Sequence, residues 1–141
     1  GILTSDLDAG IVYTAHTSEF GWQEAKTDGI VAGYPRQDLF LAAVRIQLGA
    51  NMPEGNVRYV VKLAQRSSEW CMDGELAGSA EKANPLLGIR INLTGEIAET
   101  YDITYRVYVS EQGWTAWGRN GSYVGGDAMQ ALQVKLVKKT E

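Results

Sequence analysis

The sequence contains very few of the residues that cross-link or activate small proteins. Its 141 residues include one cysteine, Cys71, and one histidine, His16. A single cysteine cannot form an internal disulfide, so no covalent cross-link within the chain holds the fold. A cysteine nucleophile needs a nearby base, and nothing in the spacing pairs Cys71 with His16. We therefore expect a small buried thiol beside Trp70 and no catalytic activity.

Several partner classes also lack their usual residues. Asp6 and Asp8 lack the glycine and the third acidic ligand of a calcium loop, and the sequence has no glycine-rich phosphate cradle. The net charge of −4 disfavours the concentrated basic face of a nucleic-acid-binding protein. No apolar run reaches the length of a membrane span. We expect no metal, no cofactor, no nucleic-acid partner and no membrane insertion.

Proline is scarce, with 3 residues against 16 glycines. This balance is typical of short strands joined by glycine turns, and no stretch keeps a helical period. The N-terminus lacks a signal-peptide pattern, as expected of a mature or excised domain or an intracellular chain. We expect one all-β domain, residues 11–141, after a lead-in or linker, residues 1–10.

What the sequence does have is a threefold internal repeat. Tyr13, Tyr59 and Tyr105 are 46 residues apart, and each opens a stretch with a tryptophan, an Asp-Gly or Asn-Gly pair and a second glycine. Units of this length bury their apolar face only against neighbours, so the three should share one core. Their approximate bounds are residues 11–48, 57–93 and 103–137.

Within each unit, apolar and polar residues alternate as in strands with one buried face. Six residues of the closing strands are expected to be buried together: Val44, Ile46, Ile89, Ile91, Leu132 and Val134. Asp28-Gly29, Asp73-Gly74 and Asn120-Gly121 predict hairpin turns, because both central residues of such turns need positive φ. The later Gly33, Gly78 and Gly125 predict a second fixed bend in each unit.

About four strands per unit, or twelve in all, favour a pseudo-threefold closed domain. The β-trefoil and the β-prism both have this count. We prefer the trefoil, in which the closing strand of one unit and the opening strand of the next form a long hairpin. Six such strands would close a barrel, capped by three short hairpins. The prism fits the same pattern.

Particular segments resemble a known family. HTSEFGWQ, DGIVAG, LFLAAVRIQL, the stretch from LLGIRINLTGEIAETYD to GWTAWGRNG, and ALQVKLVKK are similar to the clostridial hydrophobic repeat with a signature tryptophan, the ChW repeat, in three tandem copies. In the second copy Glu69 stands where the pattern has glycine. The resemblance implies an extracellular or cell-surface module, part of a larger multidomain protein of Gram-positive bacteria. It implies carbohydrate, cell wall or another surface partner, and no catalytic residues.

The tryptophans divide into two kinds. Trp22, Trp70 and Trp114 recur once per unit, which favours a structural role, with each plugging one end of the barrel, over contact with a ligand. Trp117 has no counterpart in this alignment, because Ala25 takes its place in the first unit. It lies three residues after Trp114, so on a strand the two point to opposite faces. If Trp114 is buried, Trp117 is exposed.

An exposed tryptophan beside polar residues is typical of a sugar-stacking site. Arg119, Asn120 and Tyr123 are close in sequence and are predicted to bind the same ligand, and Tyr34 with Phe20 predicts a second aromatic patch. The alternatives are that Trp117 covers a loop or a subunit contact and that Tyr34 lines a turn. We predict a non-catalytic surface or secreted module that recognises carbohydrate or cell-wall polysaccharide. A protein–protein interaction, adhesion or structural module is the alternative.

Overall fold

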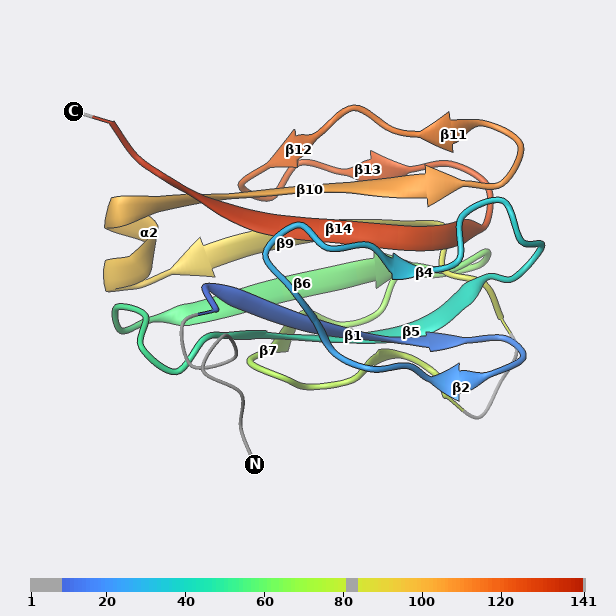
Figure 1. The fold of residues 1–141 in the computed structure, drawn as a ribbon, viewed down its shortest axis with the longest axis horizontal. Helices are drawn as coiled ribbons and strands as arrows, with labels where there is room; N and C mark the ends of the chain where they lie inside the picture. Colours follow the sequence, from blue (N-terminus) through green and yellow to red (C-terminus); the bar gives the residue numbers. More distant parts are fainter. Residues whose placement is uncertain (1–8, 81–83, 141) are drawn as a thin grey trace.

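The computed structural model describes residues 9–80 and 84–140, and most of the predicted lead-in lies outside them. The described chain is all-β, with long strands running along the long axis of the molecule (Figure 1). The first unit holds β1 (Ile11–Thr17), β2 (Gly21–Trp22), β3 (Lys26–Thr27), β4 (Ala32–Gly33) and β5 (Leu41–Leu48). The second holds β6 (Asn56–Lys62), β7 (Cys71–Met72), β8 (Ala77–Gly78) and β9 (Gly88–Thr94). The third holds β10 (Tyr101–Val109), β11 (Gly113–Trp114), β12 (Gly118–Arg119), β13 (Val124–Gly125) and β14 (Met129–Lys138).

One short helix, α2 (Glu96–Thr100), joins β9 to β10 at one end of the molecule (Figure 1). It buries Ile97 against the core and ends where β10 begins. No helix in the described part of the chain has the length and apolar character needed to cross a membrane.

The opening and closing strands of each unit pair with each other. β1 pairs with β5, β6 with β9 and β10 with β14, all antiparallel. The expected hairpins between units are therefore wrong: β5 pairs with β1 and β8, not with β6. None of the three sheets closes on itself. The apolar alternation is the same in all six long strands, so it does not specify which two of them pair.

Each sheet also contains a short strand from another unit. β8 of the second unit pairs with β5, β13 of the third pairs with β9, and β4 of the first pairs with β14. Every unit thus gives one strand and receives one, so the three sheets are linked in a ring. No unit can complete its own sheet without a neighbour.

At each Asp-Gly or Asn-Gly pair the chain passes from one sheet to the next. Both residues of each pair have positive φ, as predicted, from 44° at Asp28 to 92° at Gly121. The strands that flank each pair do not pair with each other, however, so these turns do not form the expected hairpins. β3 pairs with β1 before the first turn, whereas β4 pairs with β14 after it. Each turn carries the chain from its own sheet to a neighbour's.

Two hydrogen bonds hold each turn between the sheets that it joins. In the first unit Asp28 Oδ1 accepts the Ile11 N–H of β1 at 3.0 Å, and the Gly29 N–H donates to the Val134 carbonyl of β14 at 2.7 Å. The same pair of bonds recurs twice. Asp73 accepts from Val57 and Gly74 donates to Ile46; Asn120 accepts from Ile103 and Gly121 donates to Ile91.

The six predicted core residues are all fully buried, which confirms their assignment. They belong to one apolar cluster that contains residues of all three sheets. Tyr13, Tyr59 and Tyr105 are buried in the same cluster. Their hydroxyls donate to the carbonyls of Ile30, Glu75 and Ser122, each the residue directly after the turn glycine. The tyrosines therefore fix the chain between the turn and the strand that joins the neighbouring sheet.

The second glycine of each unit lies where two backbones nearly touch. A Cβ on Gly33, Gly78 or Gly125 would lie 2.3–2.4 Å from a carbonyl oxygen of the receiving sheet. Gly78 has φ +96° and faces the Ala42 carbonyl, while Gly113 has a similar φ, +88°, but no atom within 4 Å of its Cβ position. Alanine substitutions at these two glycines therefore distinguish the free-energy cost of positive φ from that of a steric clash with the backbone.

We expect Gly113→Ala to lower the free energy of unfolding by about 1–2 kcal/mol, the cost of a left-handed residue. Gly78→Ala should cost about 1–3 kcal/mol more, because its methyl group meets backbone. Urea unfolding of both variants measures the difference. Equal losses would mean that the donated strand β8 is not tightly held.

Alkaline pH should weaken the fold through the buried tyrosines. Burial raises the pKa of Tyr13 and Tyr59 to about 12, whereas the pKa of an unfolded tyrosine is about 10. The folded state therefore keeps its protons between these values while the unfolded state releases them, and stability falls as pH rises. Each tyrosine should contribute on the order of 2–3 kcal/mol to this loss. Urea unfolding at pH 9 and 11.5 should show a smaller loss for Tyr13→Phe than for the unmodified protein, and identical losses would contradict this account.

Candidate binding site

Strand pairing changes the alignment of the tryptophans. Trp22 pairs with His16 and Trp114 with Tyr108, at the same place in their units. In the second unit this place is taken by Ser67, which bridges to Lys62. The first tryptophan position is therefore filled by Trp22, Ser67 and Trp114.

Trp70 occupies a different position. It directly precedes Cys71, which pairs with Tyr59, just as Trp117 directly precedes Gly118, which pairs with Tyr105. The second position is therefore filled by Ala25, Trp70 and Trp117. The expectation that Trp117 has no counterpart is therefore wrong. The loop before Trp70 is shorter than in the other units, so sequence alone matches Trp70 with Trp22 and Trp114, whereas strand register matches it with Trp117.

The tryptophans lie on the surface and do not plug the core. Trp22 is 37% exposed, Trp70 47% and Trp117 39%, while Trp114 is half-buried. An arginine side chain lies over each of the four rings, at 5.1 Å for Arg45 over Trp22 and 5.0 Å for Arg58 over Trp70. Cations over aromatic faces are mutually attracted through the ring quadrupole. Each indole therefore lies next to an arginine on the surface of a sheet.

The third sheet carries the most extensive stack. The Arg106 guanidinium of β10 lies 4.5 Å from the Trp114 ring centre and 4.9 Å from that of Trp117. Lys135 of β14 lies 4.6 Å from Trp117. Both indoles thus contact one side chain, so they share the outer face of the sheet, contrary to the predicted opposite faces. The strand alternation fails here because residues 115–117 lie between β11 and β12 and belong to neither strand.

Trp117 and Tyr123, two of the predicted ligand-binding residues, line the same hollow. Its volume is about 300 Å³, and Thr115, Ser122 and Val124 are among its other lining residues. Each of the two aromatic residues is 39% exposed. Gly118 also lines the hollow, and Val124 lies 2.7 Å from the place that its Cβ would take.

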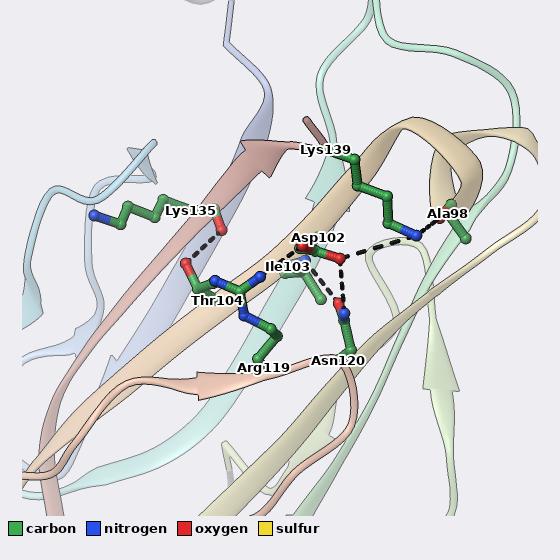
Figure 2. A network of polar contacts seen from close by, with 8 residues as sticks. All are labelled: Ala98, Asp102, Ile103, Thr104, Arg119, Asn120, Lys135 and Lys139. Atoms are coloured by element: carbon green, nitrogen blue, oxygen red, sulfur yellow. Dashed lines mark hydrogen bonds and ion pairs between the residues drawn. The ribbon is translucent and has the colours of Figure 1, made fainter. Parts of the chain in front are cut away.

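Arg119 and Asn120 serve the scaffold (Figure 2). The Asn120 amide donates to Asp102 Oδ1 at 2.8 Å, and its oxygen accepts the Ile103 N–H at 2.9 Å. Arg119 forms an ion pair with Asp102 at 2.6 Å, and Lys139 lies 3.9 Å from the same carboxylate. Through these contacts the two predicted ligand-binding residues connect the start of β10 with the turn into β13.

Tyr34 lies in the first unit, over the equivalent hollow, which has about 230 Å³ and is lined by Gln23 and Lys26. Its hydroxyl donates to Gln23 Oε1 at 2.6 Å, and its ring meets Phe20 edge-on at 5.8 Å. The predicted contact between Phe20 and Tyr34 is therefore present. Tyr34 does not line the hollow of Trp117.

Cys71 is half-buried and lacks the environment of a nucleophile. Its thiol donates to the carbonyls of Leu76 and Glu69 at 3.4 and 3.5 Å. Burial, and then the nearby Glu75 and Glu69, raise the pKa of Cys71, so the thiol stays protonated at neutral pH. Within residues 9–80 and 84–140, no three histidine, cysteine, aspartate or glutamate side chains gather as a metal site would require.

Comparison of the chain with models of protein families, with curated proteins and with solved structures gives no match.

The Trp114–Arg106–Trp117 stack predicts a measurable contribution to stability. Arg106→Ala should lower the free energy of unfolding by about 1–2 kcal/mol, because two rings lose a cation and Gln133 loses the Arg106 hydrogen bond of 2.7 Å. Arg66→Ala is the matched control, an exposed arginine for which the described residues show no ring stacking. Urea unfolding monitored by tryptophan fluorescence compares them. Equal stability of the two variants would show that the stack is not energetically significant.

Proposed function

We propose that the protein is a non-catalytic binding module that holds a cell-wall polysaccharide or a related glycan between Trp117 and Tyr123. The observation that carries the proposal is their position: two partly exposed aromatic side chains line one hollow of about 300 Å³. Aromatic rings bind the apolar C–H face of a sugar, and a hollow of this size accommodates one or two sugar rings. The two other polar side chains that line the hollow, Thr115 and Ser122, are hydrogen-bonded to the backbone, so stacking is the main source of affinity.

Affinity at one such site is low. One stacking contact contributes roughly 0.5–1.5 kcal/mol beyond its buried area, and association costs several times this amount. A polymer that presents many copies of one sugar, or several copies of the module, compensates by avidity. The need for avidity and the resemblance to the ChW repeat both support a further proposal. We propose that the chain is a surface or secreted module of a larger protein.

The ring of exchanged strands supports the prism alternative for the architecture. Three sheets that stay separate and share one core leave three outer faces exposed to solvent. We propose that these faces, rather than the ends of a barrel, carry the ligand.

A protein partner is the second candidate. Phe20 is 62% exposed and Ile30 54% exposed, and both belong to the first unit. Exposed aromatic and apolar side chains are enriched at protein interfaces. A partner of this kind would use the first unit and would leave Trp117 unaffected.

The test is retention on insoluble Gram-positive cell-wall polysaccharide that has been treated with protease. Trp117→Ala should bind about three- to tenfold more weakly, as the loss of one stacking contact implies. Trp70→Ala is the matched control, because Trp70 holds the same position in the second unit and is also stacked on an arginine. Undiminished retention of Trp117→Ala would refute the proposal, and binding that protease abolishes would favour the protein partner.

A further inference from the structure

A second hollow lies over the outer face of β6 and β9. Its volume is about 290 Å³, and Lys62, Ser67, Arg90 and Tyr123 line it together with Val60 and Val61. Val60 and Arg90 are paired across the two strands. Tyr123 comes from the third unit and also lines the hollow of Trp117, so one ring separates the two.

The hollow lies where a tryptophan stands in the other units. Arg45 pairs with Thr14 as Arg90 pairs with Val60, so the two arginines are equivalent. Arg45 stacks on Trp22, and the place of Trp22 is taken by Ser67 in the second unit. A hydroxymethyl group fills much less space than an indole. The second unit thus keeps the cation of this position but has no tryptophan of its own there, and the aromatic ring next to Arg90 is Tyr123 of the third unit.

Two cations converge on this space. Arg90 lies 5.5 Å and Lys62 5.9 Å from the centre of the Tyr123 ring. No acidic residue is among those that line the hollow in the described part of the chain. One N–H of Arg90 donates to the Gly121 carbonyl at 3.1 Å, which uses one of the five donors of a guanidinium. A local excess of two positive charges is notable in a chain with a net charge of −4.

The hydroxyl groups complete a donor set. Burial raises the pKa of Tyr123 and outweighs the lowering effect of Arg90, so its hydroxyl is protonated at neutral pH and is available as a donor. Ser67 adds a second hydroxyl at the exposed edge. A guanidinium, an ammonium and hydroxyl donors match the oxygens of a carboxylate or a phosphate.

We propose that this second hollow binds the anionic group, carboxylate or phosphate, of an acidic polysaccharide. The anion contacts Arg90 and Lys62, while the adjoining sugar ring continues past Tyr123 toward Trp117. The anion site stands on its own residues, and only its extension to a polymer rests on the proposed function.

The first test uses small anions. Titration with glucuronate and, separately, with inorganic phosphate is followed by NMR shifts of the Tyr123 and Ser67 amides and the Arg90 side chain. Saturable shifts confined to this hollow are expected for at least one anion, and the stronger of the two identifies the source. Absence of saturable shifts with both anions overturns the proposal.

Two variants distinguish specific anion binding in the hollow from general attraction to positive charge. Ser67→Trp restores the residue that the other units have, fills the hollow and keeps both cations, so it should abolish the anion shifts. Arg90→Gln should weaken anion binding at least tenfold. Arg45→Gln is the matched control, because it makes the same charge change at the equivalent position over Trp22. Equal weakening by Arg45→Gln, or full binding by Ser67→Trp, would show general charge attraction and contradict a site.

Polymers then distinguish the two proposals. Retention on an acidic polysaccharide is compared with retention on the same polymer after carboxyl reduction or dephosphorylation. A tenfold preference for the acidic form that Ser67→Trp removes supports the anion site. Equal retention on both forms, lost with Trp117→Ala, refutes the anion site and supports the glycan hollow alone. Anion binding with unchanged retention of Trp117→Ala supports the anion site and refutes the hollow.

Discussion

The structure depends on a two-residue turn that only a few residue types can make. In each unit an aspartate or asparagine followed by glycine takes positive φ at both residues, which lets the chain leave one sheet and enter the next. The side chain of the first residue binds the opening strand of its own unit, and the amide of the glycine binds the closing strand of the neighbour. A buried tyrosine hydroxyl then holds the carbonyl of the residue directly after the glycine. Because every unit is held in this way by another, the three sheets form together.

This arrangement separates the scaffold from the surface. The turns, the tyrosines and the apolar faces of the long strands are nearly identical in the three units, since a change in any of them would disturb two sheets. The outer faces carry no such constraint. They differ in which of two tryptophan positions is filled, and both positions are filled only in the third unit, by Trp114 and Trp117. The proposed ligand contacts follow from these differences: an added tryptophan makes a stacking face, and an omitted one leaves a basic hollow.

Much of the interior is predictable from sequence. Period-two alternation identified Val44, Ile46 and their equivalents as buried, and the φ requirement identified the turns, because both depend on local chemistry alone. The partners of the long strands were not predictable, since six strands share one alternation and any two of them match. The equivalence of Trp70 with Trp117 was also missed, because a shortened loop permits two alignments and only strand register decides between them. The stacking of arginines on the tryptophan rings was not predicted. Arg45, Arg58 and Arg106 do not occupy equivalent positions in the three units, so the repeat pattern does not reveal them.

Amide hydrogen exchange at Gly29, Gly74 and Gly121 tests the central claim most directly. Each amide donates at 2.7 Å to a carbonyl of the neighbouring unit, so together they report whether the sheets are held as one body. If the turns hold the ring together, all three amides exchange only when the whole domain unfolds, and their opening free energies equal the global free energy of unfolding. Local opening at one or more of these glycines, with a free energy several kcal/mol below the global value, would contradict the account.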